Sequence, residues 1–428
     1  MEELIQWKNS KNRKPLIIRG ARQVGKTWLM KEFGKKNYEK YAYINFENNS
    51  RMQQLFQGDI EINRIVQGLK IETGVNIEAE NTLIIFDEVQ ENPNALTSLK
   101  YFYEEGNHYS IVAAGSLLGV AMHAGTSFPV GKVDFLDLYP LCFQEFLSAM
   151  GEEQLVELLD KLDFKMIEVF ADKLKRYLKQ YVYIGGMPEV VNSYIEDKDF
   201  NNVRRIQMRL LEAYEQDFSK HAPNAVVPRI RQLWNNIPTQ LAKENKKFIY
   251  GLVKEGARAR EYEIALSWLI DCGLVYQVNR VKDCKIPLSA YQDFSAFKLY
   301  LLDVGLLCAL AGVDVKTILE GDSLFVEFKG ALTEQFVLCE LKENTKAPIF
   351  YWSSEKGIAE LDYIIQLEDQ NIPIEVKSAE NLQSKSLKTF VEKYKTKINV
   401  RTSMSNYRKE DWMINIPLYM IGNIEKIK

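Results

Sequence analysis

The sequence has few of the residues that build disulfide frameworks and His/Cys metal centres. Its 428 residues include 5 cysteines and 3 histidines. The cysteines are odd in number, scattered, and form no C-x-x-C pair, so we expect reduced thiols of a cytoplasmic protein and no zinc site. They are Cys142, Cys272, Cys284, Cys308 and Cys339. The histidines lie far apart, which is unlike a metal centre.

Long hydrophobic runs are also missing. No apolar stretch approaches the roughly 18 residues that a membrane span needs, and the N-terminal sequence MEELIQWKNSKNRK has no apolar core of a signal peptide. We therefore expect no membrane partner and a cytoplasmic location.

No strong charge imbalance marks the chain. Its formal net charge is −3, which argues against a protein coated with polyanion, although a local basic face is compatible with it. A content of 46% hydrophobic and 26% charged residues is typical of globular proteins. The length predicts two to three domains.

The most informative stretch is residues 16–27, LIIRGARQVGKT. It has the pattern of a short apolar strand, a glycine-bounded loop and the start of a helix, and the loop fits G-x-x-x-x-G-K-[ST], the phosphate-binding loop of nucleoside triphosphate hydrolases. Tight turns at two glycines direct successive N–H groups into one anion-binding concavity. The predicted ATP-binding residues are Gly20, Ala21, Arg22, Gln23, Val24, Gly25, Lys26 and Thr27.

Two of these residues have further predicted roles. Lys26 is expected to place its ammonium against the β- and γ-phosphates, and the hydroxyl of Thr27 is expected to hold Mg²⁺.

A second landmark lies about 60 residues downstream. Residues 82–88, TLIIFDE, indicate a strand buried on both faces that ends in two carboxylates at the ligand edge of a parallel sheet. We expect Asp87 to hold Mg²⁺ through water and Glu88 to polarise the attacking water. A third strand, residues 110–115, ends at Ser116, whose hydroxyl could sense the γ-phosphate.

At this point the first third of the chain resembles the AAA-type P-loop ATPases. More narrowly, GARQVGKT, LIIFDEVQ, AAGSLLG, VGKVDFLDLYPLCFQEFL and YIGGMPEVV resemble an uncharacterised prokaryotic family that joins such an ATPase to a C-terminal domain of unknown function. The resemblance implies that Ser116 is the sensor and that Gly186 and Pro188 contact adenine. Ordinary helix initiation at Pro188 is the alternative.

Residues from about 150 to 220 have apolar positions at helical spacing and resemble the helical lid of such an ATPase. Arg204, Arg205 and Arg209 could reach a nucleotide, and Lys132 could take the place of a phosphate-facing arginine. Solvated side chains are the alternative for all four.

The next segment predicts a helix, a turn, a helix and a β-hairpin, which is the pattern of a winged helix-turn-helix. Between Pro223 and Pro287 it holds eleven basic and six acidic residues, a local excess of five positive charges. This basicity favours DNA contact. Packing or self-association is the alternative.

The last segment carries a second chemical pattern. Glu334 lies in a predicted helix, and the predicted strands IFYWSS, ELDYIIQL and NIPIEVKSA follow it. Glu375 and Lys377 are two apart and so share a strand face, and a hairpin would bring Asp362 beside them. This arrangement resembles the PD-(D/E)XK nucleases, in which such carboxylates hold Mg²⁺ or Mn²⁺ and the lysine acts on the attacking water. Leu361 replaces the proline of the motif, and a salt-bridge ladder is the alternative.

These patterns together predict an α/β protein with three parts. They are a parallel-sheet P-loop ATPase core with a helical lid (1–222), a winged-helix module (223–318) and a restriction-endonuclease-like domain (319–428). We expect an Mg²⁺-dependent ATPase with a half that binds or cleaves DNA. The alternatives are a nucleotide-switched regulatory or scaffolding ATPase, whose nuclease-like domain is inactive and binds protein, and a chaperone-like remodeller of protein partners.

Overall fold

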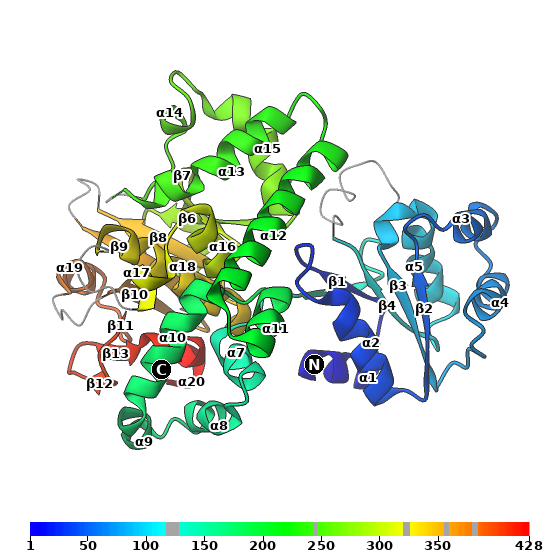
Figure 1. Ribbon diagram of the computed structural model, residues 1–428, viewed down its shortest axis with the longest axis horizontal. Helices are drawn as coiled ribbons and strands as arrows, with labels where there is room; N and C mark the ends of the chain where they lie inside the picture. The colour runs from blue at the N-terminus through cyan, green and yellow to red at the C-terminus, as the bar shows by residue number, and fades with distance from the viewer. Residues whose placement is uncertain (117–127, 244–245, 320–325, 355–358, 379–383, 428) are drawn as a thin grey trace. The chain divides into compact units, whose positions relative to one another are not determined.

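A computed structural model describes residues 1–116, 128–243, 246–319, 326–354, 359–378 and 384–427 (Figure 1). The chain divides into two compact units. The first comprises residues 1–139 with 271–273, and the second comprises residues 140–270 with 274–428.

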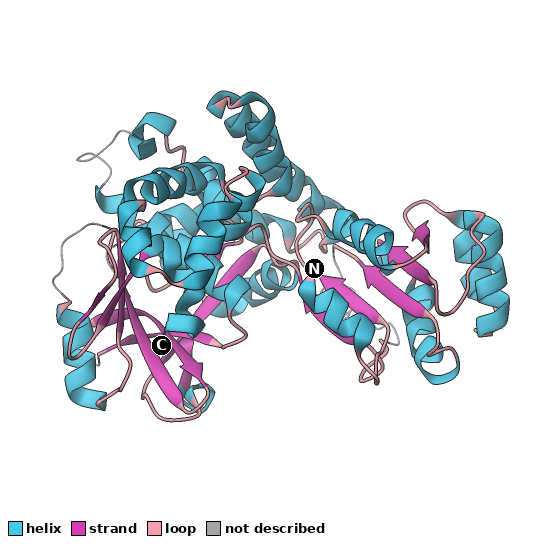
Figure 2. Cartoon of the chain, turned by 90° about the horizontal axis from the view of Figure 1, so that it is seen from below, coloured by secondary structure: helices cyan, strands magenta, loops and turns pink. Residues whose placement is uncertain are grey.

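The first unit is built on a five-stranded parallel sheet in the order β2-β3-β4-β1-β5. Figure 2 shows the strands of the chain in magenta and its helices in cyan. Its strands are β1 (Leu16–Arg19), β2 (Lys40–Asn45), β3 (Thr82–Asp87), β4 (Ser110–Ala114) and β5 (Asp134–Asp137). Every residue of β3 and β4 is buried, as expected for strands inside a parallel sheet. The prediction of a parallel-sheet core is confirmed.

Helices cover both faces of this sheet. Leu16 and Ile18 of β1 pack into one apolar cluster with residues of α1 and α2, whereas Ile17 points into a second cluster with residues of α3, α4 and α5. The alternation follows from the two-residue period of a strand. The helices are α1 (Glu2–Asn9), α2 (Lys26–Asn37), α3 (Ser50–Gln57), α4 (Ile62–Thr73) and α5 (Pro93–Glu105), and the 3₁₀ turn η1 spans Val89–Glu91.

The second unit begins with a helical region. The helices predicted between about 150 and 220 are present, but they belong to this second unit and not to the unit that contains the sheet of β1. The helices of this region are α7 (Phe143–Ala149), α8 (Glu153–Lys161), α9 (Phe164–Val169), α10 (Ala171–Ile184), α11 (Pro188–Asp197), α12 (Phe200–His221), α13 (Val227–Leu241), α14 (Tyr250–Val253) and α15 (Ala259–Asp271).

A mixed sheet in the order β12-β13-β11-β10-β9-β8-β6-β7 forms the rest of the second unit. Its strands are β6 (Val275–Val281), β7 (Gln292–Leu301), β8 (Ile349–Ser353), β9 (Glu360–Leu367), β10 (Gln370–Val376), β11 (Val400–Ser403), β12 (Arg408–Lys409) and β13 (Ile414–Pro417). The accompanying helices are α16 (Val304–Leu310), α17 (Val315–Leu319), α18 (Val326–Asn344), α19 (Lys385–Tyr394) and α20 (Ile424–Ile427), with 3₁₀ turns η2 (Leu288–Tyr291) and η3 (Leu418–Asn423).

The predicted boundary after residue 318 falls inside this arrangement. The hairpin β6–β7 is present, but β6 also pairs in parallel with β8, with Asn279 opposite Phe350. The segments predicted as separate modules therefore share one sheet. Among the residues described, no helix is long and apolar enough to cross a membrane.

Candidate nucleotide site and a buried ion cluster

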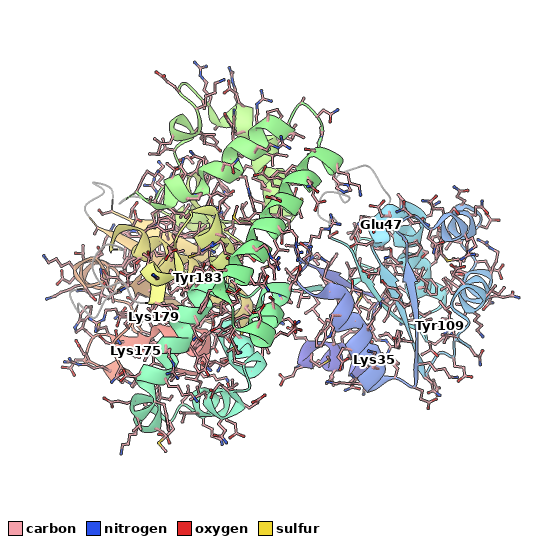
Figure 3. All side chains as sticks on the ribbon, viewed as in Figure 1. Lys35, Glu47, Tyr109, Lys175, Lys179 and Tyr183 are labelled. Carbon is pink, nitrogen blue, oxygen red and sulfur yellow. The ribbon has the colours of Figure 1, made fainter. Side chains whose placement is uncertain are left out.

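The loop between β1 and α2 has the backbone of a phosphate-binding loop. Gly20 and Gly25 have φ values of 149° and 98°, in the region that favours glycine. A Cβ atom on Gly20 would lie 2.2 Å from the carbonyl oxygen of Leu138, so a larger residue would clash with backbone. Gly25 precedes the first turn of α2. Lys35, in the last turn of the same helix, is exposed (Figure 3).

Lys26 lies inside the loop. Its side chain donates hydrogen bonds to the carbonyl oxygens of Gly20 at 2.9 Å and Ala21 at 2.7 Å, and the residue is only 6% exposed. Burial lowers the pKa of Lys26 to about 8, while Glu88 and Asp87 act in the opposite direction. The ammonium therefore lies where an anion would stabilise its charge.

Asp87 ends β3 and links the loop to the sheet. Its Oδ2 accepts hydrogen bonds from the hydroxyl groups of Thr27 at 2.7 Å and Tyr43 at 2.8 Å, and the residue is 3% exposed. Thr27 and Asp87, the two residues predicted to hold Mg²⁺ at this site, therefore lie in direct contact. Tyr43 was not predicted. Its only signal in the sequence is its place in the strand before β3.

Glu88 follows Asp87 with a φ of 49°, a left-handed conformation uncommon for a residue with a side chain. Its Oε2 accepts hydrogen bonds from Nε2 of Gln90 at 2.7 Å and Oγ of Ser116 at 3.0 Å. Burial acts to raise the pKa of Glu88, but these hydrogen bonds and the charge of Lys26 outweigh it, so the pKa is lowered. Glu88 is an ionised carboxylate at neutral pH.

The sheet order explains why these residues meet. Strand β4 lies between β1 and β3, so the segment that follows it lies between the phosphate loop and the Asp87–Glu88 pair. Ser116 occupies this place, and the residues that follow it, 117–127, lie outside the described part of the chain. An oxygen-rich set from Thr27 and Asp87 beside an anion-binding loop suits Mg²⁺.

Other predicted nucleotide contacts have structural explanations. Gly186 donates its N–H to Oδ2 of Asp303 at 2.7 Å, and Pro188 is the first residue of α11. A Cβ atom on Gly186 would lie 2.1 Å from the carbonyl oxygen of Leu141. Packing and helix initiation thus account for both residues, and their contact with adenine stays a prediction.

The predicted arginines and Lys132 have protein partners as well. Arg204 donates to the carbonyl oxygen of Val313 at 2.6 Å. Arg205 hydrogen-bonds Asn202 and Arg209 pairs with Glu189. Lys132 lies 2.9 Å from Glu104. None of these contacts requires a nucleotide.

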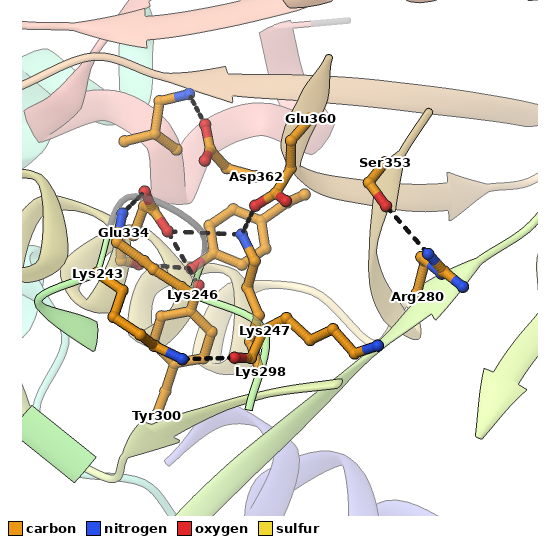
Figure 4. Close-up of polar contacts among 12 residues, drawn as sticks. Lys243, Lys246, Lys247, Arg280, Lys298, Tyr300, Glu334, Ser353, Glu360 and Asp362 are labelled. Atoms are coloured by element: carbon orange, nitrogen blue, oxygen red, sulfur yellow. Dashed lines mark hydrogen bonds and ion pairs between the residues drawn. The ribbon is translucent and has the colours of Figure 1, made fainter. Parts of the chain in front are cut away.

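In the second unit, Glu334 is the centre of a buried ion cluster (Figure 4). This α18 residue pairs with Lys246 and lies 3.9 Å from Lys298 of β7, which in turn lies 2.5 Å from Glu360. The hydroxyl of Tyr300 donates to Glu334 at 3.0 Å. Burial acts to raise the pKa of Glu334, but the two lysines outweigh it and the pKa is lowered.

Asp362 belongs to the same cluster and is hydrogen-bonded to Glu334. Its Oδ2 also accepts the N–H of Val376 at 2.7 Å. Burial and the charge of Glu334 raise the pKa of Asp362 to about 8, so its carboxyl group is protonated at neutral pH. Two lysines and two carboxylates, Glu334 and Glu360, then make the cluster neutral. The lysines Lys246 and Lys298 were not predicted.

A β-bulge in β9 places Glu375 and the buried ion cluster on opposite faces of the sheet. Phe350 pairs with Ile364 and Trp352 pairs with Leu361, so two residues of β9, Asp362 and Tyr363, face a single residue of β8. Leu361 and Ile364 both pack with residues of α19, which places Asp362 and Tyr363 together on the other face, where the Tyr363 hydroxyl donates to the Glu334 carbonyl.

The pairing of β9 with β10 determines the face of the sheet from which Glu375 projects. Ile374 is opposite Tyr363, so Glu375, one residue later, projects from the face that packs against α19. There it lies 3.0 Å from Lys377 and beside Arg401, which reaches Oγ of Ser384 at the start of α19. The structure therefore pairs Glu334 with Asp362 and Glu375 with Lys377, but does not bring the two pairs together. In the described ranges, no three Asp, Glu, His or Cys residues form a group able to hold a metal ion.

The basic excess between residues 223 and 287 is partly neutralised. Lys246 pairs with Glu334 and Arg280 with Asp293, two acidic residues outside this range, whereas the pair of Lys285 with Asp283 lies within it. Three exposed basic residues remain around the start of α15, namely Lys254, Arg258 and Arg260. The exposed side of α15 also carries Glu261, Glu263 and Ile264.

Comparisons with known proteins divide the chain in three. Residues 12–147 match the family described as AAA domain. Residues 175–317 match the Domain of unknown function (DUF8612), and residues 329–421 match the Domain of unknown function (DUF4143). Uncharacterized protein MJ1637 of Methanocaldococcus jannaschii is 22% identical over 238 residues, and the match covers 49% of this chain and 49% of that protein, so it spans about half the length of that relative.

Solved structures give weaker likenesses. The Walker-type ATPase PABY2304 of Pyrococcus abyssi is 14% identical with a TM-score of 0.45, covering 72% of this chain and 94% of its own. The ORC2 protein of Aeropyrum pernix in its ADP form is 16% identical with a TM-score of 0.28, covering 72% and 87%. The match to the AAA family, together with the loop, Lys26 and the Thr27–Asp87 contact, shows that the N-terminal part of this chain is a P-loop ATPase domain.

Proposed function

We propose that this chain is an Mg²⁺-dependent ATPase that acts as a nucleotide-switched regulatory or scaffolding protein, with a second unit that binds a partner. The observation that carries the first half is the hydrogen bond of 2.7 Å between the Thr27 hydroxyl and Asp87. It joins the loop that would hold the phosphates to the strand end that would hold the ion.

The proposed roles follow from the contacts. Backbone N–H groups of residues 20–27 would bind the triphosphate, and Lys26 would turn from the loop carbonyls toward the β- and γ-phosphates. Thr27 and Asp87 would hold Mg²⁺, which neutralises charge on the phosphates. Glu88 is ionised and would accept a proton from the attacking water. Ser116, bonded to Glu88, would report the presence of the γ-phosphate.

The buried ion cluster favours a binding role for the second unit. Lys246 and Lys298 already supply the positive charge that a divalent ion would supply at Glu334, and Asp362 is protonated. Glu375 and Lys377 lie on the other face of the sheet. A winged-helix fold for α13–β7 and a PD-(D/E)XK-like fold for the C-terminal part remain proposals, and neither requires cleavage.

A second candidate function is Mg²⁺- or Mn²⁺-dependent DNA cleavage, the activity first expected for this unit. The close pair Glu334–Asp362 favours DNA cleavage, because two adjacent carboxyl groups can supply part of the ligand set of a divalent ion. So does Glu375, which is 3% exposed and whose Oε2 accepts no hydrogen bond from any described group. Incubating the full chain with plasmid and linear DNA and either ion, with and without ATP, decides between the two functions.

Lys26→Ala tests the ATPase assignment, with Lys35→Ala on the exposed side of the same helix as the control. The first variant should lose at least about tenfold in ATP affinity, because a charge-assisted contact to phosphate contributes about 1.5–3 kcal/mol. The control should bind like the original chain. Unchanged affinity in a folded Lys26→Ala protein would refute the site.

A further inference from the structure

Tyr43 is a residue of β2 whose side chain reaches the end of β3 at the nucleotide site. It pairs with Ile85 in the register of β2 and β3, and its hydroxyl donates to Oδ2 of Asp87 at 2.8 Å. Asp87 is two residues beyond Ile85 on the same face of the strand. The phenol ring therefore lies along the sheet, and its polar end meets the carboxylate.

Three groups of the described residues donate hydrogen bonds to the Asp87 carboxylate. Oδ2 accepts from Thr27 and Tyr43, and Oδ1 accepts from the N–H of Glu88 at 3.2 Å. Three donors from three segments hold the carboxylate in one orientation. Without the Tyr43 hydroxyl, Oδ2 would keep only the short side chain of Thr27, which is itself proposed to bind the ion.

Lys31 lies on the ring of Tyr43. Its ammonium is 3.6 Å from the ring centroid, the distance of a cation–π contact. Lys31 is four residues after Thr27 and so lies one turn further along α2 on the same side. This contact fixes the ring between α2 and β2.

We propose that Tyr43 is a positioning residue for Mg²⁺, and that it orients Asp87 so that the ion is held with ATP. The proposal rests on the proposed ATPase function and assigns it a residue outside the loop and the Asp87–Glu88 pair. Partners that orient a ligand typically contribute 10–100-fold to metal affinity. Tyr43 contacts Asp87 and Lys31, so we expect its hydroxyl to act on binding of the ion and not on the phosphate loop.

Tyr43→Phe removes the hydroxyl and keeps the ring, and Tyr41→Phe is its matched control. Tyr41 lies two residues earlier on the same strand and the same face, and its burial is similar. Binding of a fluorescent ATP analogue is measured first with EDTA and then over a titration of Mg²⁺. ATP hydrolysis is measured over the same titration.

Tyr43→Phe should bind the analogue in EDTA like the original chain, and should need about tenfold or more Mg²⁺ to reach half of the ion's effect. Tyr41→Phe should match the original chain in both measurements. An unchanged Mg²⁺ requirement in Tyr43→Phe would overturn the inference, and so would an equal loss of binding in EDTA. If the original chain binds no ATP, the proposed ATPase function is refuted, and this result is distinguishable from a failure of the Tyr43 inference.

Discussion

The hydroxyl of Ser116 donates a hydrogen bond of 3.0 Å to Oε2 of Glu88, joining the ends of β4 and β3. Gln90 donates to the same oxygen at 2.7 Å. The backbone N–H of Ser116 donates to it as well, at 3.4 Å. An oxygen that already accepts three hydrogen bonds is a weaker base than a free one, so Glu88 is restrained in this arrangement. Movement of the Ser116 hydroxyl toward a γ-phosphate would release one of these bonds.

Glu88→Gln should bind ATP and hydrolyse it at least about a hundredfold more slowly, the usual contribution of a positioned base. Glutamine keeps the shape of the side chain and removes the carboxylate. Glu91→Gln, at the exposed end of η1, is the control and should hydrolyse normally. Phosphate release and analogue binding are the measurements, and normal turnover by Glu88→Gln would assign the base elsewhere.

The sequence predicted the conformation of the candidate nucleotide site where the pattern is local. Gly20, Lys26 and Thr27 lie within eight residues, and the motif dictates their conformation. Asp87 was recognisable because a buried strand of four apolar residues precedes it. Tyr43 could not be recognised, since its contact with Asp87 depends on the register of β2 against β3.

The second unit shows what residue spacing cannot reveal. Alternation along ideal strands placed Asp362 and Glu375 on one face, but the bulge at Asp362–Tyr363 reverses that relation. Lys246 and Lys298 come from segments about 90 and 40 residues before Glu334, and no local pattern marks them. The pairing of β6 with β8 is likewise a long-range contact.

The ion cluster predicts a contrast between two neutralising variants. Glu334→Gln would leave Lys246 and Lys298 without their shared carboxylate, and should destabilise the protein by about 3–5 kcal/mol. Asp362→Asn should cost far less, because an amide resembles the protonated acid that the structure holds. Urea denaturation of the full chain measures both.

A metal-binding function would be detected in a different assay, as an effect of Mn²⁺ on the melting temperature. If Mn²⁺ raised the melting temperature of the nucleotide-free chain and Asp362→Asn abolished that rise, the nuclease candidate would replace the binding role.

DNA binding by the second unit should depend on the exposed basic residues at the start of α15. Replacing Arg258 and Arg260 together with alanine should reduce the slope of log affinity against log salt by about one unit per lost phosphate contact. The control replaces Lys165 and Lys198, exposed lysines outside residues 223–287. Fluorescence anisotropy with a labelled duplex at several salt concentrations is the measurement. Absence of binding at low salt would favour a protein partner, in keeping with Glu261, Glu263 and Ile264 on the same helix.

The stability of the chain should fall as the pH rises from about 5 to about 8, partly because of Glu340. This α18 residue is 3% exposed and its Oε1 accepts the N–H of Phe143 at 2.8 Å. Burial raises the pKa of Glu340 to about 8, whereas glutamate in an unfolded chain has a pKa of about 4.3. Between these values the folded state holds a proton that the unfolded state has released, so each rise in pH favours unfolding.

Glu340→Gln mimics the protonated group and removes its titration. The variant should show a shallower decline over this interval, and at pH 8.5 should exceed the original chain in free energy of unfolding by about 1 kcal/mol or more, since one unit of pKa displacement corresponds to about 1.4 kcal/mol. Asp362, whose pKa is also raised to about 8, accounts for part of the slope that remains. Urea denaturation from pH 5 to 8.5 measures the free energy of unfolding of each variant, with Glu196→Gln at an exposed position as the control. Equal slopes for Glu340→Gln and the original chain would show that Glu340 is ionised in the folded protein.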